Sequence, residues 1–430
     1  MSSVRLLPPA TLTQPGLVQD HLVRATIPLA SSKSESNRAL IIDALTGFRC
    51  DLKNLSTARD TQTMIRLLKS TDPVADVLDA GTTMRFLTAY FAVTGQQKTM
   101  TGTPRMCERP IGMLVDALRT LGADITYLKE TGYPPLQLNG FSASGNNQIS
   151  IRGDVSSQYI SALLMIAPLL PEGLTLALTG PIGSQPYIEM TLEQMRFFGA
   201  DVQADWDNKL ITVAPKPYTP ATYAIESDWS GASYWYSVSA LAKDETAGLT
   251  LLGLKAKSLQ GDSAIADMMQ AFGVESTFIE AGVRLTKVPA SDSLAWDFTD
   301  CPDLAQTVAV CAAMKGITLR LTGIESLKIK ETDRVLALQT ELQKIGAELV
   351  ELEPNHRYEV RQTSTKPSAP ATIATYDDHR MAMAFAPVAM RQEIIIEEPG
   401  VVAKSYPSFW DDMARVTTVE FLSEETGRPS

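Results

Sequence analysis

An internal repeat constrains the fold of this chain more than any other feature of its sequence. Four amphipathic helical patterns each end in an apolar residue, a glycine, an alanine or valine, and an acidic residue. The glycines of these motifs are Gly122, Gly199, Gly273 and Gly346, at intervals of 77, 74 and 73 residues. Glycine suits the left-handed position that ends a helix, and the residues after each motif read as strands. The chain is therefore predicted to repeat one α/β unit along its length.

A second series of helices recurs with the same period and is apolar on nearly all sides, so these helices are expected to be buried. They span residues 84–93, 159–170, 232–242, 304–314 and 381–390. A shorter first unit supplies helical patterns at residues 38–45 and 61–69. We predict six units, each with one buried and one amphipathic helix, separated by β-rich segments.

The length of the chain and one proline-rich stretch indicate two domains. At 430 residues the chain is long for a single hydrophobic core. The proline-rich stretch, residues 214–220, precedes the fourth unit and leaves three repeats on each side. The residues before Lys33 are expected to pair with the C-terminal half. We therefore predict one domain of residues 31–225 and a discontinuous second domain of residues 1–30 and 226–430.

Composition argues against several classes of function. The net charge of −11 is unfavourable for binding nucleic acid, and the longest apolar segment, residues 159–170, is too short to cross a bilayer. The four cysteines form no CxxC pair and there are only three histidines, so no zinc signature is present. Residues 1–20 lack the apolar run of a signal peptide. We expect a cytoplasmic protein with free thiols, no metal ion and no membrane partner.

The residues at the starts of the buried helices are polar, glycine or charged. They are Ser32-Lys33-Ser34, Ala80-Gly81-Thr82, Ser156-Ser157-Gln158, Asp228-Trp229-Ser230, Pro302-Asp303 and Asp377-Asp378-His379-Arg380. Capping residues occur at any helix start, but Lys33, Gln158 and Arg380 exceed what capping requires. Since the start of a helix attracts anions, six such ends gathered in one place would bind anions strongly without a metal.

The segment Lys330-Glu331-Thr332-Asp333-Arg334 places four charges in five residues directly ahead of an amphipathic helical pattern. We expect Thr332 to be the N-cap and Asp333 to lie in the first turn. Taken alone, the segment is typical of a solvated helix start. Its cations also reinforce the positive end of the helix, and Glu331 is able to transfer a proton.

Seven motifs, in this order along the chain, resemble those of the EPSP synthase (3-phosphoshikimate 1-carboxyvinyltransferase) family. They are the segments 32–40, 80–85, 105–111, 156–159, 330–334, 378–383 and 404–407. The resemblance extends from about residue 28 to residue 410. It implies a two-domain inverted α/β fold, barrel-like, with three βαβαββ-type repeats in each domain and a substrate cleft between the domains.

The resemblance also implies an activity. Proteins of this family move the enolpyruvyl group of phosphoenolpyruvate to the 5-hydroxyl of shikimate 3-phosphate and release phosphate, by addition and elimination, in the synthesis of chorismate and the aromatic amino acids. It implies that the chain needs no cofactor, that it is a target of glyphosate, and that it acts as a monomer on these two small-molecule substrates.

Site residues follow by matching the family motifs to positions in this sequence. For shikimate 3-phosphate they are Lys33, Ser34, Arg38, Ser156, Ser157, Gln158, Ser184, Asp303, Ser326 and Lys330. For phosphoenolpyruvate they are Lys33, Gly81, Arg109, Gln158, Arg334, Arg380 and Lys404. The arginine fork suits the paired oxygens of carboxylate and phosphate, and at Gly81 a side chain would occupy the space of the ligand.

Three of these residues are expected to be catalytic. Asp303 resembles the proton acceptor for the attacking hydroxyl, and Glu331, together with Lys33, would move a proton at the methylene carbon. We expect His379 to pack near the site and Arg85 to form a structural ion pair. The sequence departs from the family pattern at Ser326, where Asn is common; Asp79 and Phe86 also replace the usual Asn and Pro.

Two alternative functions are open. UDP-N-acetylglucosamine enolpyruvyl transferase shares the fold and the donor, but it uses a loop cysteine at the position of Pro104 here. We interpret Cys107 as a bystander. The second alternative is a non-catalytic anion-binding repeat protein of the same fold. The joint presence of Asp303, Glu331 and Lys33 argues against it, because binding alone does not require acid–base residues.

Overall fold

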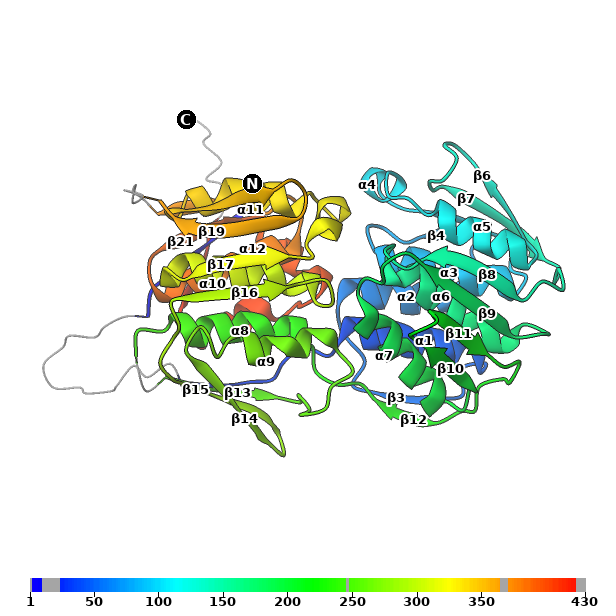
Figure 1. The fold of residues 1–430 in the computed structure, drawn as a ribbon, viewed down its shortest axis with the longest axis horizontal. Helices are drawn as coiled ribbons and strands as arrows, with labels where there is room; N and C mark the ends of the chain where they lie inside the picture. The colour runs from blue at the N-terminus through cyan, green and yellow to red at the C-terminus, as the bar shows by residue number, and fades with distance from the viewer. Residues whose placement is uncertain (1, 10–23, 245–246, 364–369, 423–430) are drawn as a thin grey trace, which may run out of the picture. The chain divides into compact units, whose positions relative to one another are not determined.

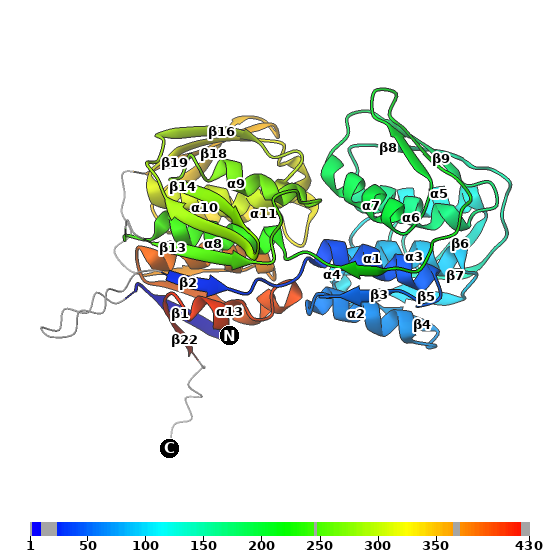
Figure 2. The same cartoon turned by 90° about the horizontal axis from the view of Figure 1, so that it is seen from below.

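The structure is a computed structural model that describes residues 2–9, 24–244, 247–363 and 370–422. The chain divides into two compact units, a C-terminal unit of Met1–Ala30 with Ser227–Ser430 and an N-terminal unit of Ser31–Glu226. These limits differ by one residue from those expected from the sequence. Figures 1 and 2 show the elements of each unit in two views.

The N-terminal unit has three sheets around buried helices. Two sheets have four strands each, in the orders β4-β5-β7-β6 and β10-β11-β9-β8, and the third is the parallel pair β3 and β12. The strands are β3 (Asp51–Lys53), β4 (Val74–Asp76), β5 (Lys98–Thr101), β6 (Ala123–Tyr127), β7 (Leu136–Phe141), β8 (Gln148–Arg152), β9 (Leu174–Thr179), β10 (Val202–Asp205), β11 (Leu210–Val213) and β12 (Thr222–Ala224). The helices are α1 (Lys33–Leu45), α2 (Arg59–Lys69), α3 (Gly81–Val93), α4 (Pro104–Cys107), α5 (Gly112–Leu121), α6 (Ser157–Ile166) and α7 (Gln185–Phe197).

The described part of the C-terminal unit has three four-stranded sheets, in the orders β20-β21-β1-β22, β14-β15-β13-β2 and β16-β17-β19-β18. The strands are β1 (Ser3–Leu7), β2 (Arg24–Ile27), β13 (Gly248–Leu252), β14 (Val274–Ile279), β15 (Gly282–Lys287), β16 (Ser293–Asp297), β17 (Thr318–Thr322), β18 (Ala347–Glu353), β19 (Arg357–Gln362), β20 (Ala371–Ile373), β21 (Ile394–Glu397) and β22 (Thr418–Leu422). The helices are α8 (Trp229–Leu241), α9 (Ile265–Met268), α10 (Ala305–Lys315), α11 (Arg334–Gln343), α12 (His379–Phe385) and α13 (Phe409–Met413).

The sheets show the repeat directly. Each four-stranded sheet combines one parallel pair with two antiparallel neighbours, as in β4-β5-β7-β6. The sheet of β3 and β12 keeps only the parallel pair, which accounts for the shorter first unit seen in the sequence. Strands β1 and β2 precede Ala30 in the chain, yet both complete sheets of the C-terminal unit. The predicted two-domain α/β fold with repeated units is confirmed.

The apolar helices form the cores, as their composition predicts. In the N-terminal unit α1, α3 and α6 contact one another, and in the C-terminal unit α10 contacts both α8 and α12. Most residues of these helices are buried. The polar residues at the start of each core helix must therefore lie at the edge of the core. That placement brings the polar starts of neighbouring helices close together.

The repeat glycines have the backbone that the sequence predicts. Gly122, Gly199, Gly273 and Gly346 have φ angles of 115°, 85°, 83° and 84°, in the region that L side chains rarely adopt. At Gly122 a Cβ would also lie 1.9 Å from the carbonyl oxygen of Ser142. Glycine is therefore required at this helix end by both backbone conformation and space.

Two local predictions are wrong. The N-cap of α11 is Asp333 rather than Thr332, because the Asp333 carboxylate accepts the backbone N–H of Leu336 at 3.0 Å. The amphipathic helix expected before Gly273 is reduced to α9, which follows a 3₁₀ turn at Gly261–Ala264. Both differences arise from side-chain and loop contacts that hydrophobic periodicity does not report.

Candidate active site

In the N-terminal unit, hydrogen bonds join the starts of α1, α2, α3 and α6. Lys33, the first residue of α1, lies with its Nζ 2.9 Å from Oδ2 of Asp60 in α2. The Thr83 hydroxyl donates to the backbone carbonyl of Asp60 at 3.2 Å. Gln158 in α6 donates to the Thr82 hydroxyl of α3 at 2.9 Å. We call Lys33, Gly81, Arg109 and Gln158 the N-terminal cluster.

Gly81 contacts the Arg109 guanidinium closely. A Cβ at Gly81 would lie 2.7 and 2.9 Å from Nη1 and Nη2 of Arg109. Arg85 donates to the carbonyls of Gly81 and Pro110, both at 3.0 Å, so it helps to hold this loop in place. The backbone of Gly81 and the cation of Arg109 therefore form one surface, on which a side chain at residue 81 would intrude.

The serines predicted to bind shikimate 3-phosphate are at helix starts. Ser156 caps α6 by accepting the N–H of Gln158 at 3.4 Å, and Ser157 begins that helix. Ser184 has a φ of 53° immediately before α7. Ser34 lies in the first turn of α1 next to Lys33. All of them lie beside free backbone N–H groups of a helix start.

Arg38 lies in a different setting from these residues. Its side chain is buried and donates to the hydroxyls of Thr191 (2.7 Å) and Ser161 (3.2 Å) and to the carbonyls of Ser34 (2.9 Å) and Tyr187 (3.2 Å). Burial lowers the pKa of Arg38 to about 10. These bonds tie α1 to α6 and α7, so the position of Arg38 favours a role in supporting the N-terminal cluster.

In the C-terminal unit, Arg334 lies at the centre of a buried network of ion pairs. It is the first residue of α11, and its guanidinium lies 3.0 Å from Asp303, 2.8 Å from Glu331 and 2.7 Å from Asp378. The Arg334 side chain is only 2% exposed and that of Asp378 is fully buried. Burial alone would lower the pKa of Arg334, but the three carboxylates outweigh burial and raise it.

Asp303 lies between this arginine and a second one. Arg380, near the start of α12, donates to Oδ2 of Asp303 at 2.8 Å, and Nζ of Lys330 lies 3.8 Å from Oδ1. Burial would raise the pKa of Asp303, but the charges of Arg380, Lys330 and Arg334 outweigh burial and hold it below the usual range. These cations therefore favour the ionised form of Asp303.

Glu331 is also held between two cations. Its Oε2 lies 2.8 Å from Arg334 and its Oε1 lies 3.7 Å from Nζ of Lys404. The ammonium group of Lys330 is desolvated by burial, which lowers its pKa. We call Asp303, Glu331, Lys330, Arg334, Arg380 and Lys404 the C-terminal cluster. Ser326 is exposed in the 3₁₀ turn Glu325–Ile329 and lies outside this network of ion pairs.

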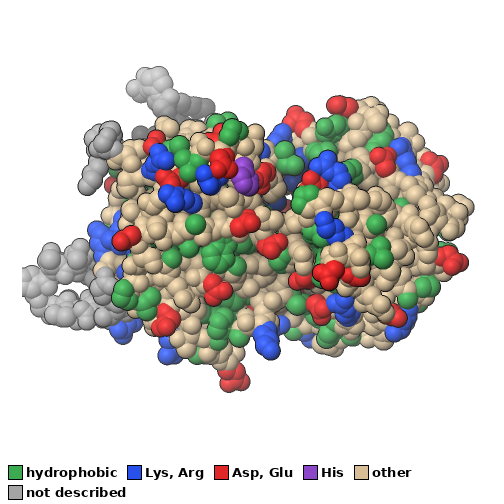
Figure 3. Space-filling view, in the orientation of Figure 1, with side chains coloured by type: hydrophobic (Ala, Val, Ile, Leu, Met, Phe, Trp, Pro, Cys, Tyr) green, Lys and Arg blue, Asp and Glu red, His purple; other side chains and the backbone are tan. Residues whose placement is uncertain are grey.

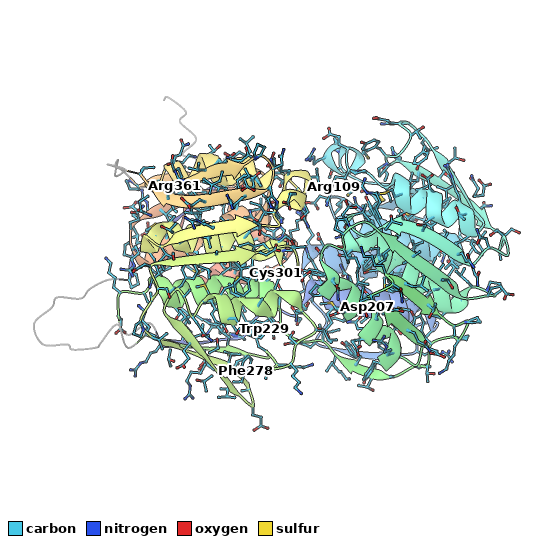
Figure 4. All side chains as sticks on the ribbon, viewed as in Figure 1. Arg109, Asp207, Trp229, Phe278, Cys301 and Arg361 are labelled. Carbon is cyan, nitrogen blue, oxygen red and sulfur yellow. The ribbon has the colours of Figure 1, made fainter. Side chains whose placement is uncertain are left out.

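Each cluster thus concentrates cations at helix starts within an acidic protein. On the face shown in Figure 3, acidic and basic side chains are interspersed rather than gathered into one basic patch. Figure 4 shows Arg109 ahead of α5, Trp229 at the start of α8 and Cys301 ahead of α10. His379 is buried at the start of α12, where the sequence predicted packing.

The chain is similar to a known protein family. A family model described as EPSP synthase (3-phosphoshikimate 1-carboxyvinyltransferase) matches residues 70–413. This chain belongs to the EPSP synthase family. The resemblance identified from the sequence motifs is confirmed.

Curated relatives and solved structures agree with this family. A 3-phosphoshikimate 1-carboxyvinyltransferase of Bacteroides fragilis is 48% identical over 396 residues, covering 91% of this chain and 95% of that protein. One from Shigella flexneri is 37% identical over 423 residues, covering 92% and 97%. The structure of EPSP synthase from Acinetobacter baumannii has a TM-score of 0.74 at 21% identity, covering 98% of this chain and all of that one. That likeness shows a shared fold.

Several contact residues were not predicted from the sequence. Asp60 pairs with Lys33 and Asp378 pairs with Arg334. Asp262 accepts a hydrogen bond from Ser230, next to the C-terminal cluster. Asp60 begins an amphipathic pattern and Asp378 precedes a buried helix. Helix capping alone was therefore enough to explain both carboxylates in the sequence. Nothing in the periodicity singles out Asp262.

Among the described residues no group of three or more His, Cys, Asp or Glu side chains is arranged to hold a metal ion. In the same part of the chain, every helix is too short or too polar to cross a bilayer.

Proposed function

We propose that the two clusters together carry out the reaction for which the family is named. In that reaction the enolpyruvyl group of phosphoenolpyruvate is transferred to the 5-hydroxyl of shikimate 3-phosphate, and phosphate is released. The observation that carries the proposal is the setting of Asp303. It is a partly buried carboxylate, 18% exposed, held by two arginines and a lysine at the start of a core helix. Binding of anions alone does not require an acid–base residue among the cations.

The charge of the substrates explains why the cations are needed. Each substrate carries a phosphate and a carboxylate, and several negative charges can be bound close together only against concentrated cations and helix starts. We propose that shikimate 3-phosphate binds Lys33, Ser34 and the serines at the starts of α6 and α7, with Gln158, Asp303, Lys330 and Ser326. Arg38 would mainly hold those helices in place, because protein acceptors take four of its five N–H donors and leave at most one for the phosphate.

For phosphoenolpyruvate we propose contacts with both clusters. Lys33, Gly81, Arg109 and Gln158 would come from the N-terminal cluster, and Arg334, Arg380 and Lys404 from the C-terminal cluster. The arginine forks match the paired oxygens of carboxylate and phosphate. The close approach of Gly81 to Arg109 supports this assignment, because it leaves the guanidinium open to a ligand on the side where a Cβ would lie.

The roles of the acid–base residues follow from the network of ion pairs. Asp303 would accept the proton of the attacking hydroxyl. Its low pKa makes it a weak base while Arg334 and Arg380 face it. An anionic ligand bound to those arginines would offset their positive charge. The pKa of Asp303 would then rise towards the operating pH, where a general base is most effective. Glu331, held between Arg334 and Lys404, would transfer a proton at the methylene carbon together with Lys33.

The alternative of a UDP-N-acetylglucosamine enolpyruvyl transferase is less well supported. Its loop cysteine corresponds to Pro104, the first residue of α4. Cys107 ends that helix, and its thiol lies 3.7 Å from the carbonyl of Gly102.

The four cysteines are free thiols, which supports the cytoplasmic location expected from the sequence. We keep the monomer and the absence of a cofactor as proposals.

The test is release of inorganic phosphate by the purified chain. We expect release only when shikimate 3-phosphate and phosphoenolpyruvate are both present, and inhibition of it by glyphosate. Release with UDP-N-acetylglucosamine in place of shikimate 3-phosphate would identify the other transferase. Binding of both substrates without any turnover would favour the non-catalytic alternative.

A further inference from the structure

Asp262 is a buried carboxylate beside the C-terminal cluster that neither the sequence motifs nor the proposed mechanism uses. It lies in the 3₁₀ turn Gly261–Ala264 and is 2% exposed. Its Oδ2 accepts a short hydrogen bond from the Ser230 hydroxyl. Its Oδ1 has no hydrogen-bond partner within the described part of the chain. Burying a carboxylate with so little compensation costs free energy, so its position calls for an explanation.

The contact between Asp262 and Ser230 is built by the fold. Gln260, two residues before Asp262, accepts the backbone N–H of Trp229 at 3.0 Å and donates to the carbonyl of Ser227 at 2.8 Å. Both bonds fasten the 3₁₀ turn against the start of α8, where Ser230 lies in the first turn. Asp262 is therefore held facing the Ser230 hydroxyl by two anchored segments of backbone.

Ser230 connects Asp262 to Arg380. Nη2 of Arg380 lies 3.4 Å from the Ser230 oxygen and 2.8 Å from Oδ2 of Asp303. A serine hydroxyl has one proton and two lone pairs. Because the proton is directed at Asp262, the lone pairs of the Ser230 oxygen are available to Arg380. Asp262 thus determines which way the hydroxyl turns, and the hydroxyl provides a second acceptor for the guanidinium.

We propose that Asp262 is a positioning residue that acts through Ser230 to orient Arg380 for its anionic ligand. The inference rests on the proposed function, in which Arg380 binds phosphoenolpyruvate. It adds to that function a residue two hydrogen bonds away from Arg380, outside the predicted site. Asp303 accepts from both ends of the Arg380 fork, through its backbone carbonyl at 3.4 Å and its Oδ2 at 2.8 Å. Ser230 adds an acceptor from a different helix, so the fork is held from two sides.

The ionisation of Asp262 should make this effect depend on pH. Burial and the neighbouring charges of Asp303 and Asp228 raise the pKa of Asp262 to about 7, while Arg380 and Ser230 act to lower it. The nearby Cys301 thiol stays neutral, because burial raises its pKa to about 12. Below neutral pH a protonated Asp262 would donate to one lone pair of Ser230 and would no longer hold the Ser230 proton. That proton would then be free to turn towards Arg380, so the positioning is present above about pH 7 and weakens as the pH falls.

The experiment compares Asp262→Asn and Ser230→Ala with wild type between pH 6 and pH 9. The matched control is Asp267→Asn, an exposed aspartate in α9. Ratios of variant to wild type remove the ionisation of the substrates themselves. We expect Asp262→Asn to raise the KM for phosphoenolpyruvate roughly five- to tenfold at pH 8.5, the net size of one ordinary hydrogen bond. The KM for shikimate 3-phosphate and kcat should change by less than about twofold, and the KM ratio should approach one at pH 6.

Two outcomes would overturn the proposal. One is a folded Asp262→Asn enzyme whose KM for phosphoenolpyruvate equals that of wild type at every pH. The other is a double variant whose effect is the product of the two single effects, because residues in one chain of contacts should not be additive. The control Asp267→Asn should match wild type throughout.

A readout without substrate separates this proposal from the proposed function. Carbon-13 labelling of aspartate, with the Asp262 signal assigned from Asp262→Asn, follows the carboxyl directly by NMR. Ser230→Ala should move the titration midpoint of Asp262 upwards, because the ionised form loses its hydrogen bond. An unmoved midpoint would show that Ser230 and Asp262 are not coupled. Wild-type protein that releases no phosphate would instead refute the proposed function, and the titration would still decide the coupling.

Discussion

Arg334→Met is the substitution for which the structure makes the most specific prediction. Methionine has a similar length and no charge, so the change removes the three ion pairs at 2.7 to 3.0 Å with little loss of volume. Asp303 and Glu331 keep other cations, Arg380 and Lys404. Asp378 is fully buried; within the described part of the chain it would keep the backbone N–H of Arg380 at 2.8 Å, and the ring of the neighbouring His379 lies 3.7 Å away.

The magnitude follows from the loss of one partner of a buried ion pair, which costs about 3–5 kcal/mol. We therefore expect the free energy of unfolding of the C-terminal unit to fall by about 4 kcal/mol at pH 7.5. The pH dependence has a definite sign. The folded-state pKa of Asp303 is lowered by its cations, so the stability that this pairing contributes is present above the unfolded pKa and is lost as the pH falls through the folded value. The difference between variant and wild type should therefore shrink in acid, below about pH 4.

The assay is urea unfolding followed by tryptophan fluorescence. Four of the five tryptophans, Trp229, Trp235, Trp296 and Trp410, belong to the C-terminal unit, so the signal reports mainly on that unit. Arg361→Met is the control. Arg361 (Figure 4) has a side chain 45% exposed and pairs with Glu359, which also keeps Arg320 at 2.7 Å. A pair with an exposed partner contributes at most about 1 kcal/mol. The reasoning is refuted if Arg334→Met loses no more stability than Arg361→Met, or loses as much in acid as at neutral pH.

Three further substitutions test individual assignments. Gly81→Ala should raise the KM for phosphoenolpyruvate about tenfold, or about 1.4 kcal/mol, because the new Cβ displaces the Arg109 guanidinium; steady-state kinetics with an unchanged KM would contradict this. Arg38→Lys should lower the thermal unfolding midpoint, because lysine cannot reproduce four hydrogen bonds in different directions. An unchanged midpoint with a KM for shikimate 3-phosphate raised more than about 100-fold would instead make Arg38 a direct ligand contact. Cys107→Ser should keep kcat within about twofold of wild type, and a large loss in the phosphate assay would show that this thiol takes part in the reaction.

The sequence predicted those parts of the fold that hydrophobic patterns control. The buried helices lie where runs of apolar residues place them, and the repeat glycines end helices because only a residue without a side chain fits there. Lys33, Gln158 and Arg380 stood out because they are larger and more polar than a helix start requires, and the remaining site residues were named from the resemblance to the family motifs. At each of these positions in the repeat, a physical requirement selects one type of residue.

What the sequence did not predict depends on contacts between distant segments. The residues before Lys33 were expected to pair with the C-terminal half, but no local pattern records which strands β1 and β2 join, because their partners lie more than 200 residues away in the chain. The cap at Asp333 instead of Thr332 depends on which side chain reaches the N–H of Leu336. Asp262 lies in a short turn without periodicity, and its relation to Arg380 becomes visible only through Ser230.

The central claim is that a single reaction uses residues of both units. The most direct test is a rapid-mixing measurement of phosphate release in two variants, Lys33→Met from the N-terminal cluster and Asp303→Asn from the C-terminal cluster. The exposed residues Lys216 and Asp292 provide the matched controls Lys216→Met and Asp292→Asn. We predict that each cluster variant stays folded and loses at least about 100-fold in turnover, the size of one acid–base step, while the controls retain wild-type rates. Full turnover in either cluster variant would contradict the claim, because the reaction would then need only one unit.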